Sequence, residues 1–432
     1  MKKPKVACLT TFYAWIKTYS LTTVLENQLI SLVKYGYSPV LFVLPSFTDD
    51  ALVPKGVEIR KVIPQIILEP YHAHIFDHNA PVPEQFEEDK KKVITALDEH
   101  LGDIDIAITH DWSLVDDYMV YAAALAETHI PHLRVFNWIH SAPSARYDGC
   151  MEYPWKCQYT IAPNHRIVYL NNTDALMVAE RYGNELKNVR IVHNPIDART
   201  FFKPDELVSK MIDQFGLLDA DILQVYPVST PRMVENKQVD KVIRIFGKLK
   251  KLGRTVRLVV CNAHANQDRE KMTIDNMKAL AEQCGLDLKK EIIFTSLINP
   301  PTYEHGVSHD IVKDLFLLSN LFIFPTTSEN APLILLEAAS ARNLLVLNDD
   351  FLPLREFFGE SALYFKFSSL RQQTKYTDEE QYYEDVAKII NSELKYNKPL
   401  QAFRKWKQNY NSDFIFLHEI EPMLNEGMEV KP

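Results

Sequence analysis

Glycine is scarce in this chain, with only 12 among 432 residues. Gly-rich turns are the usual means of bringing backbone N–H groups close to a phosphate. Any phosphate site in this protein must therefore be built on other residues. A chain of this length exceeds one ordinary hydrophobic core, so we expect two domains.

Cysteine is also sparse, and its pattern is irregular. The five cysteines are scattered along the sequence, and their odd number suits a reducing compartment. Cys150 and Cys157, with His140 or His165, suggest a zinc site, but the spacing matches no common zinc pattern. We therefore expect no zinc site at these residues. We also expect no other metal ion and no cofactor.

Long apolar runs are missing too. No run reaches the length of a membrane span, and the first residues, MKKPKVACLTTFY, lack the features of a signal peptide. A cytoplasmic location is the resulting expectation. Arg404, Lys405 and Lys407 leave contact with a membrane surface open, although a solvated helix face is the simpler reading.

Basic residues are outnumbered by acidic ones, which gives a formal net charge of -9. This balance argues against a nucleic-acid partner without excluding a local basic patch. A hydrophobic content of 46% and a charged content of 24% fit a soluble globular protein. The oligomeric state stays open.

Short apolar segments alternate with helical stretches along the chain. In the first part the strand-like segments are KVACLTTF, PVLFVLP, DIAITH, LRVFNWIH, RIVYL and VRIVHNP. The pattern restarts at Ile222 with ILQVYPV, VRLVVC, EIIFTS, LFIFP and LLVLND. Such alternation predicts parallel sheets covered by helices on both faces.

We therefore predict an α/β fold of two doubly wound, Rossmann-like domains facing across a cleft. The predicted domains are residues 1–197 and 198–398, and ligands should bind beyond the carboxyl ends of the strands. A C-terminal helix at about 399–432, with Leu400, Phe403, Trp406 and Tyr410 on one stripe, is expected to cross back onto the first domain.

The stretch SENAPLILLEAASA, Ser328 to Ala341, contains an acid in an apolar setting. From Pro332 to Ala341 every residue except Glu337 is apolar or small, which predicts a buried helix. A buried carboxylate is costly unless it is paired, hydrogen-bonded or used in function. Glu329 lies upstream, with seven residues between the two acids.

The start of this helix has the features of an anion site. Asn330 suits the N-cap and Pro332 the first turn, so N–H groups between Asn330 and Leu333 should be free to meet a phosphate. Glu329 and Glu337 would then accept hydrogen bonds from sugar hydroxyls beside that phosphate. The alternative is structural, with Glu337 paired to an arginine and Glu329 acting as a cap.

Two cations follow the strand that begins at Ile222. In PRMVENK, Arg232 and Lys237 come after the strand's carboxyl end, where together they can neutralise a diphosphate. The alternative is a surface turn with two solvated cations. In the first domain, His110 with Asp111 and His140 end two strands and are expected to open into the cleft, or else to be ordinary hydrogen-bonded loop residues.

These residues resemble the signatures of the retaining GT-B glycosyltransferases, in particular glycosyltransferase family 4, the group 1 enzymes. PRMVENK resembles the R-x4-K signature, SENAPLILLEA the E-x7-E signature and VHNPID the N-G-V-D turn. WIHSAP and THDW resemble the histidine and the H-D elements of the first domain. The resemblance is strongest from about Val192 to Asp349.

The resemblance implies a metal-independent transfer of sugar from a nucleoside diphosphate sugar by front-face attack. Arg232 and Lys237 would hold the diphosphate, Glu329 the sugar and Glu337 the nucleotide ribose. The main chain at Asn330, Ala331, Pro332 and Leu333 would contact the donor, and His140 would lie beside the sugar.

This sequence departs from the family pattern mainly at positions where the family has glycine. The loop after the first strand, TTFYAWIKTYS, has none, so Lys17 or backbone N–H groups would have to contact phosphate there. Together with His110 and Asp111, Lys17 is a candidate on the acceptor side. Asn330 also replaces the glycine that usually follows the first glutamate of the signature.

Three other functions stay open at this point. They are a glycosyltransferase that acts on a modified nucleic-acid base, a nucleotide-sugar isomerase or epimerase of the same fold, and a non-catalytic sugar-nucleotide-binding subunit. The sequence leaves the donor base, the sugar, the acceptor and the linkage open.

Overall fold

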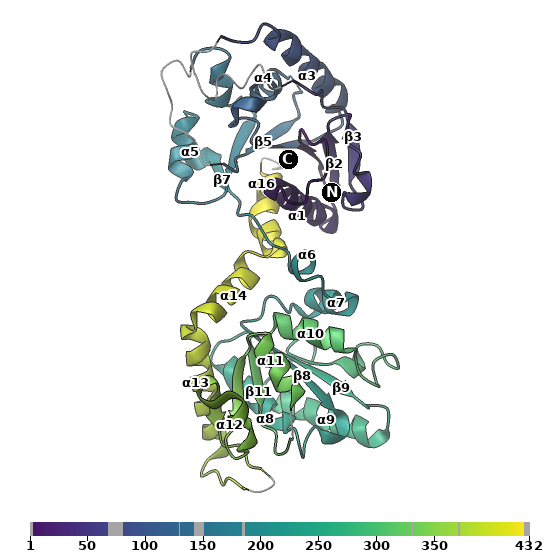
Figure 1. The fold of residues 1–432 in the computed structure, drawn as a ribbon, viewed down its shortest axis with the longest axis vertical. Helices are drawn as coiled ribbons and strands as arrows, with labels where there is room; N and C mark the ends of the chain where they lie inside the picture. Colours follow the sequence, from purple (N-terminus) through teal and green to yellow (C-terminus); the bar gives the residue numbers. More distant parts are fainter. Residues whose placement is uncertain are drawn as a thin grey trace, which may run out of the picture. The chain divides into compact units, whose positions relative to one another are not determined.

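The computed structural model describes residues 3–67, 81–128, 130–141, 151–183, 186–329, 332–369 and 372–426. The chain forms two compact units (Figure 1). Unit 1 comprises Met1–Asp197 and Tyr410–Pro432, and unit 2 comprises Ala198–Asn409.

Unit 1 contains a sheet of seven strands in the order β3-β2-β1-β4-β5-β6-β7, and every neighbouring pair is parallel. The strands are β1 (Lys5–Leu9), β2 (Ser38–Val43), β3 (Glu58–Lys61), β4 (Ile106–His110), β5 (Arg134–Trp138), β6 (His165–Tyr169) and β7 (Val189–Ile191). The order reverses between β1 and β4, because β2 and β3 extend the sheet on one side of β1 and the later strands extend it on the other.

Helices cover both faces of this sheet. The longer ones are α1 (Ser20–Lys34), α3 (Phe86–His100), α4 (Met119–Glu127) and α5 (Ala175–Arg181). Ala7 and Leu9 of β1 pack in the core formed with α3 and α4, whereas Val6 and Cys8 pack in the core formed with α1. Successive strand residues point to opposite faces, so a fully apolar strand fills two cores.

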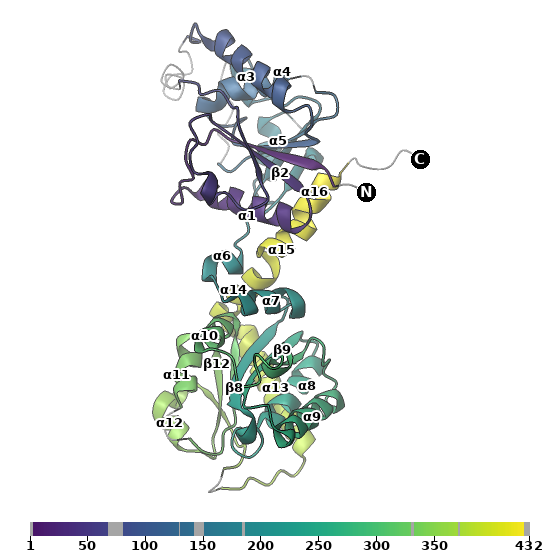
Figure 2. The ribbon, with the colours of Figure 1, turned by 90° about the vertical axis from the view of Figure 1, so that its right-hand side faces the viewer.

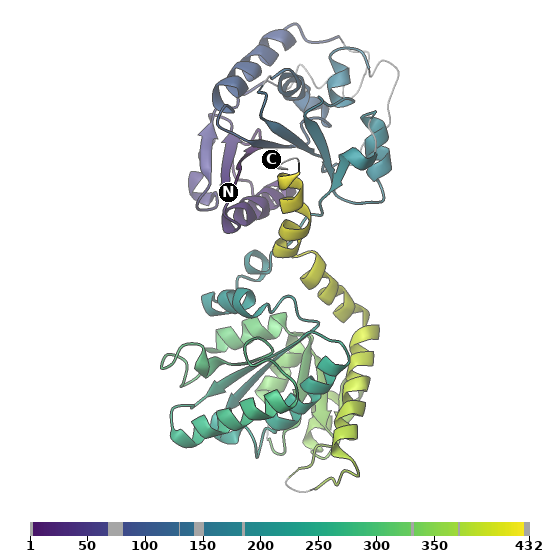
Figure 3. The ribbon, with the colours of Figure 1, turned by 180° about the vertical axis from the view of Figure 1, so that it is seen from behind.

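The C-terminal segment of unit 1 is a series of short helical pieces. They are α15 (Ser412–Ile415), a single wide turn η9 (Phe416–Ile420) and α16 (Glu421–Asn425). Ile415, Phe416 and Met423 pack in the same core as α1, and Figure 3 shows this segment beside α1.

The structure differs here from the single helix expected at about 399–432. Residues Lys398–Asn409 form α14, which belongs to unit 2, and unit 1 resumes at Tyr410. The physical reason is a new N-cap, since the side chain of Asn411 accepts a hydrogen bond from the N–H of Phe414 at 3.0 Å.

Unit 2 contains two three-stranded parallel sheets, in the orders β10-β9-β8 and β11-β12-β13. The strands are β8 (Ile222–Ser229), β9 (Val256–Ala263), β10 (Ile292–Phe294), β11 (Leu321–Phe324), β12 (Leu344–Asn348) and β13 (Leu363–Phe365). The helices are α6 (Ala198–Phe202), α7 (Glu206–Phe215), α8 (Val239–Lys251), α9 (Asp268–Gln283), α10 (His309–Leu318), α11 (Leu333–Ser340), α12 (Pro353–Phe358), α13 (Glu379–Tyr396) and α14.

A buried side chain joins the two sheets of unit 2. The side-chain amide of Gln224 on β8 donates to the carbonyl oxygen of Ile323 on β11 at 3.0 Å and accepts from its N–H at 2.9 Å. Asn320, just before β11, exchanges hydrogen bonds with Leu223 at 3.1 and 3.0 Å. These bonds replace part of a strand ladder, and one continuous core packs around both sheets.

The resulting strand sequence is β10-β9-β8-β11-β12-β13, and its order reverses between β8 and β11. Figure 2, turned by 90° from Figure 1, shows β8 among the helices of unit 2, with α13 close to α8. In open α/β sheets, ligands bind beyond the carboxyl ends of the strands at such a reversal.

Candidate functional site

Two loops of unit 2 leave the sheet on either side of this reversal. The first follows β8 and contains a short turn, η6 (Thr230–Arg232); the second follows β11. The carbonyl oxygen of Asn236 accepts from the N–H of Thr327 at 2.8 Å, and the Asn236 side chain donates to Ser328 at 3.1 Å. The two loops are therefore joined by hydrogen bonds at Asn236, directly before Lys237.

Lys237 and Glu329 lie where these loops meet. Nζ of Lys237 forms an ion pair with Oε1 of Glu329, and it also lies 4.9 Å from the centre of the Phe324 ring. The Lys237 side chain is buried, and its backbone carbonyl accepts a hydrogen bond from the hydroxyl of Tyr226 at 2.7 Å. Tyr226 on β8 thus holds the backbone of Lys237 at the carboxyl end of the sheet.

Arg232 adds a second positive charge beside Lys237. The N–H of Lys237 donates to the carbonyl oxygen of Arg232 at 3.0 Å, which closes a compact turn, and Arg232 itself is exposed. Burial, followed by the charge on Arg232, lowers the pKa of Lys237 to about 8. Since desolvation disfavours a bare ammonium, an anion at this position stabilises the charged form.

Helix α11 carries Glu337, the second acid of the segment Ser328 to Ala341. Leu335 and Ala338 are fully buried, but Leu333 is 69% exposed and Leu336 is 46% exposed. The expectation of a buried helix was therefore wrong, because this eight-residue helix packs only one narrow stripe against the core.

Glu337 is half-exposed and has an unforeseen partner. Nε2 of His309, the first residue of α10, lies 2.9 Å from Oε1 of Glu337. This histidine was missed by sequence reasoning, and the arginine partner considered for Glu337 is not what it contacts. A helix-starting histidine after Ser308 carries no signal that would reveal a contact 28 residues away.

The start of α11 also differs in detail from the expectation. Pro332 occupies the N-cap position with an extended backbone, and the helix begins at Leu333. The predicted cap Asn330 and its neighbour Ala331 lie outside the described residues. Leu333 and Pro332 remain at the amino end of the helix, on the loop that carries Glu329.

In unit 1, the predicted residues after β4 and β5 lie together. Nδ1 of His110 is 2.8 Å from Nε2 of His140, and the two rings are stacked with their centres 5.1 Å apart. Asp111 has a left-handed backbone, with φ of 59°, and its Oδ1 accepts from the N–H of His140 at 2.7 Å. The three residues therefore form one hydrogen-bonded cluster at the carboxyl edge of the sheet.

Burial keeps the imidazole rings of His110 and His140 uncharged. Desolvation lowers the pKa of His110 well below its usual value, and the neighbouring His140 lowers it further. Burial also lowers the pKa of His140, against the opposing charge of Asp111. Two neutral imidazoles that share one hydrogen bond must have complementary tautomers.

Lys17 is the remaining candidate in unit 1. It lies exposed in the loop between β1 and α1, on the other side of the strand-order reversal from His110. The loop is positioned at Trp15, whose backbone N–H donates to Oδ2 of Asp49 at 2.7 Å. Lys17 thus lies in a loop held to the sheet without glycine.

The basic residues near the C-terminus do not form one solvated face. Lys407 is completely buried, and burial lowers its pKa to about 7, whereas Arg404 pairs with Asp221 at 3.5 Å. Lys407 is therefore excluded from the membrane-contacting set considered above. No helix in the described part of the chain is both long enough and apolar enough to span a membrane.

Comparison with known proteins gives a family match in unit 2. Residues 225–406 match the model described as "Glycosyl transferases group 1". No curated protein sequence matches the chain. The match covers the loops that carry Arg232, Lys237 and Glu329 and the helix that carries Glu337.

Solved structures are only distantly similar. A glycosyltransferase from Rickettsia africae is 12% identical, with 99% of this chain and 100% of that chain covered and a TM-score of 0.39. Anabaena HepE in complex with UDP-glucose is 12% identical over 97% of this chain and 99% of that chain, with a TM-score of 0.33. WaaG, a glycosyltransferase involved in lipopolysaccharide biosynthesis, is 13% identical over 97% and 98%, with a TM-score of 0.32.

TM-scores this low add nothing to the strand orders and contacts given above. The assignment rests on the sequence match, which falls on the half of the chain with the Arg232, Lys237 and Glu329 cluster. Over residues 225–406 this chain is similar to the group 1 glycosyl transferases, and this match identifies a glycosyltransferase domain in unit 2.

Proposed function

We propose that this protein transfers a hexose-type sugar from a nucleoside diphosphate sugar to a hydroxyl acceptor, with retention of the anomeric configuration. The observation that carries the proposal is the position of Lys237 and Glu329. They meet on two hydrogen-bonded loops at the strand-order reversal of unit 2, where α/β sheets bind their ligands.

The donor's diphosphate is assigned to Arg232 and Lys237. Charge builds up on the diphosphate as the bond between the sugar and phosphate breaks, so cations already in place lower the barrier. In the absence of donor, Glu329 compensates the buried ammonium of Lys237. When the diphosphate takes over this role, the Glu329 carboxylate is released to accept hydrogen bonds from the sugar hydroxyls.

The nucleotide ribose is assigned to Glu337, with His309 as its partner. A half-exposed carboxylate 2.9 Å from an imidazole has lone pairs left for two ribose hydroxyls. The exposed Leu333 and the main chain at the start of α11 complete the donor side. In unit 1, His140 is assigned to the sugar and Asp111 and Lys17 to the acceptor side, while the buried His110 is assigned to positioning His140.

The chemical step is front-face displacement. The bond from the anomeric carbon to the phosphate oxygen breaks, and a bond to the acceptor oxygen forms on the same face. The acceptor's hydroxyl proton passes to the departing phosphate oxygen, so no separate base is required. Two fixed cations supply the charge stabilisation, and we propose that no metal ion is needed.

Nucleotide binding tests the donor site directly. UDP, GDP and ADP are compared by thermal shift with the wild type, Glu337→Ala and the exposed control Glu282→Ala. One nucleotide at a hundredfold excess over its Kd should stabilise the wild type and the control by about 2.7 kcal/mol, and Glu337→Ala by less. If none of the three nucleotides raises the melting temperature of the wild type, the donor site is wrong.

Turnover separates transfer from the alternative functions. Nucleotide release from the matching donor should depend on an added hydroxyl acceptor and persist in EDTA, and NMR of the product should show the donor's anomeric configuration. Sugar conversion without acceptor would identify an isomerase or epimerase. Nucleotide binding without turnover across an acceptor panel that includes modified DNA would support the non-catalytic subunit.

A further inference from the structure

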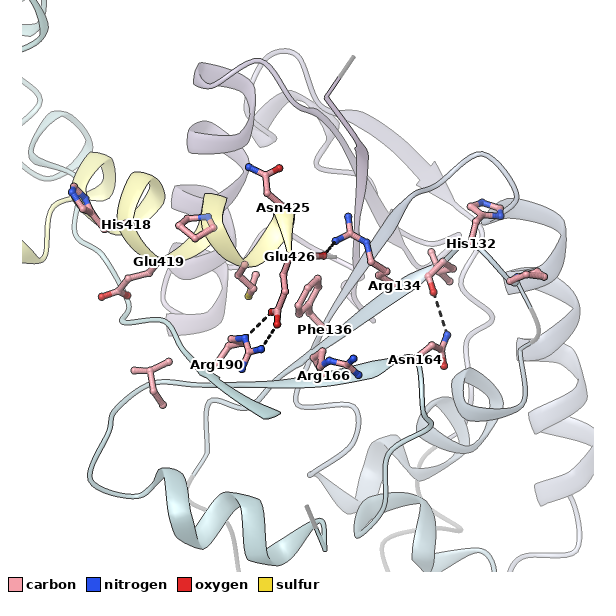
Figure 4. Close-up of a pocket in the computed structure, with 15 residues that line it drawn as sticks. His132, Arg134, Phe136, Asn164, Arg166, Arg190, His418, Glu419, Asn425 and Glu426 are labelled. Atoms are coloured by element: carbon pink, nitrogen blue, oxygen red, sulfur yellow. Dashed lines mark hydrogen bonds and ion pairs between the residues drawn. The ribbon is translucent and has the colours of Figure 1, made fainter. Parts of the chain in front are cut away.

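A basic groove lies at the amino-terminal ends of the unit 1 strands, whereas His140 lies at their carboxyl-terminal ends. It has a volume of about 950 Å³ and is lined by the amino-terminal parts of β5, β6 and β7 and by the C-terminal helices (Figure 4). Arg134 begins β5 and Trp138 ends it, so the two edges are separated by roughly 13 Å at 3.3 Å per residue. The groove is thus separate from the predicted sugar site.

Three arginines share the face of the sheet that forms this groove. Arg166 on β6 is in register with Phe136 on β5, and Arg190 on β7 is in register with Val168 on β6. Neighbouring residues in register point to the same face, and so do alternate residues of one strand. Arg134, Arg166 and Arg190 therefore form a row across three strands, in a chain with a net charge of -9.

The row already binds one oxyanion, which belongs to the protein itself. Nε of Arg190 donates to Oε2 of Glu426 at 2.7 Å, and its Nη2 pairs with the other carboxylate oxygen. Arg134 donates to the backbone carbonyl of Glu426 at 2.6 Å. Figure 4 shows Glu426 reaching from the end of α16 toward Arg190.

The position of Glu426 is unfavourable for its own helix. It occupies the C-cap of α16, where the helix dipole favours a cation rather than an acid. The arginines therefore account for its placement. Arg190 in turn lowers the pKa of Glu426, mainly through the side-chain hydrogen bond.

Arg166 adds a positive charge to the groove, and its hydrogen bonds go to backbone carbonyls rather than to Glu426. Its guanidinium donates to the carbonyl oxygens of Pro163 and His165 at 3.1 and 2.9 Å. The other acid in the lining, Glu419, is engaged elsewhere, since it accepts from the backbone N–H and Nδ1 of His193 at 2.7 and 2.9 Å. A ligand with more negative charge than one carboxylate would match the row better than Glu426 does.

We propose that this groove is a second anion site, which binds a phosphate-bearing group in place of the Glu426 carboxylate. Arginine forks bind phosphate through paired hydrogen bonds, and a di- or polyphosphate can span several of them. Glu426 then acts as an internal competitor, whose release from Arg190 accompanies binding. The inference is independent of the proposed glycosyl transfer.

Pyrophosphate binding measured by calorimetry tests the site, in the Lys237→Gln background so that the donor site does not contribute. Arg166→Ala should weaken binding about tenfold, because it removes one charge-assisted contact. Glu426→Gln should strengthen it about tenfold, because Arg190 no longer has a competing charge. The exposed Arg269→Ala in unit 2 is the matched control and should change nothing.

Vesicles identify the source of the phosphate. Binding to phosphatidylglycerol but not phosphatidylcholine vesicles, with loss in Arg166→Ala, supports a lipid headgroup, and pyrophosphate binding alone supports a soluble ligand. The inference is overturned if folded Lys237→Gln protein, with and without Glu426→Gln, binds neither pyrophosphate nor the anionic vesicles. Equal weakening by Arg269→Ala would also overturn it.

Discussion

Nδ1 of His110 and Nε2 of His140 lie 2.8 Å apart in the interior of unit 1, so the two rings share one hydrogen bond. His110 is only 2% exposed, and its other nitrogen, Nε2, is buried without a hydrogen-bond partner among the described residues. The tautomer and orientation of His140 are therefore set by a residue that is itself shielded from water.

His110→Phe should release His140 from this constraint. We expect kcat for sugar transfer to fall about tenfold with little change in nucleotide affinity, because the nucleotide is assigned to unit 2. Imidazole ¹⁵N chemical shifts should show a changed tautomer balance at His140. The exposed His132→Phe serves as control, and unchanged shifts at His140 in His110→Phe would contradict the assignment.

Acid should destabilise unit 1 through its buried histidines. Burial lowers the pKa of His165 to about 4, so below the unfolded value of 6.5 the unfolded chain takes up a proton that the folded chain does not. The stability contributed by the neutral ring is present above pH 6.5 and is lost as the pH falls toward 4. The difference amounts to about 3 kcal/mol for this ring at pH 4.

Tryptophan fluorescence can follow this loss, since Trp15, Trp112, Trp138 and Trp155 lie in unit 1 and only Trp406 lies in unit 2. Denaturant midpoints are compared at pH 7 and pH 5. His165→Asn should reduce the difference between them, because Asn has no proton to gain. A midpoint that is the same at both pH values in the wild type would refute the account.

Nucleotide affinity should weaken at alkaline pH through Lys237. With its pKa lowered to about 8, Lys237 loses its charge above that pH in the free enzyme, and binding a diphosphate must then return the proton. We expect Kd to rise steadily between pH 8 and pH 9.5 in calorimetry. Lys237→Arg keeps its charge across this range and should give a flatter profile.

Gln224 should contribute strongly to the stability of unit 2. Gln224→Met preserves the shape of the side chain but leaves the N–H and carbonyl of Ile323 without their partner in a fully buried site. We expect a loss of about 2–4 kcal/mol, since each buried group left unsatisfied costs about 1–3 kcal/mol. Hydrogen exchange at the amides of β11 measures it, and the exposed Gln283→Met should have little effect.

Much of the fold was predictable because its signals are local. Apolar strands such as Leu321–Phe324 on β11 have no polar side chain to face water on either side. Their alternation with helical stretches therefore indicated parallel sheets covered on both faces. The strand β13 and the breaks between α13, α14 and α15 were missed. Each depends on tertiary packing or on one capping side chain, such as Asn411, that periodicity does not detect.

The sequence by itself determined which residues carry chemistry: charges and histidines placed directly after apolar strands, at the edge where α/β sheets bind ligands. Only the tertiary structure decided which of them meet. Lys237 pairs with Glu329, Glu337 pairs with His309, and Arg190 binds Glu426 from the far end of the chain. These contacts depend on strand order and on side-chain direction, which are set when the sheet assembles and leave no trace in the spacing of residues along the chain.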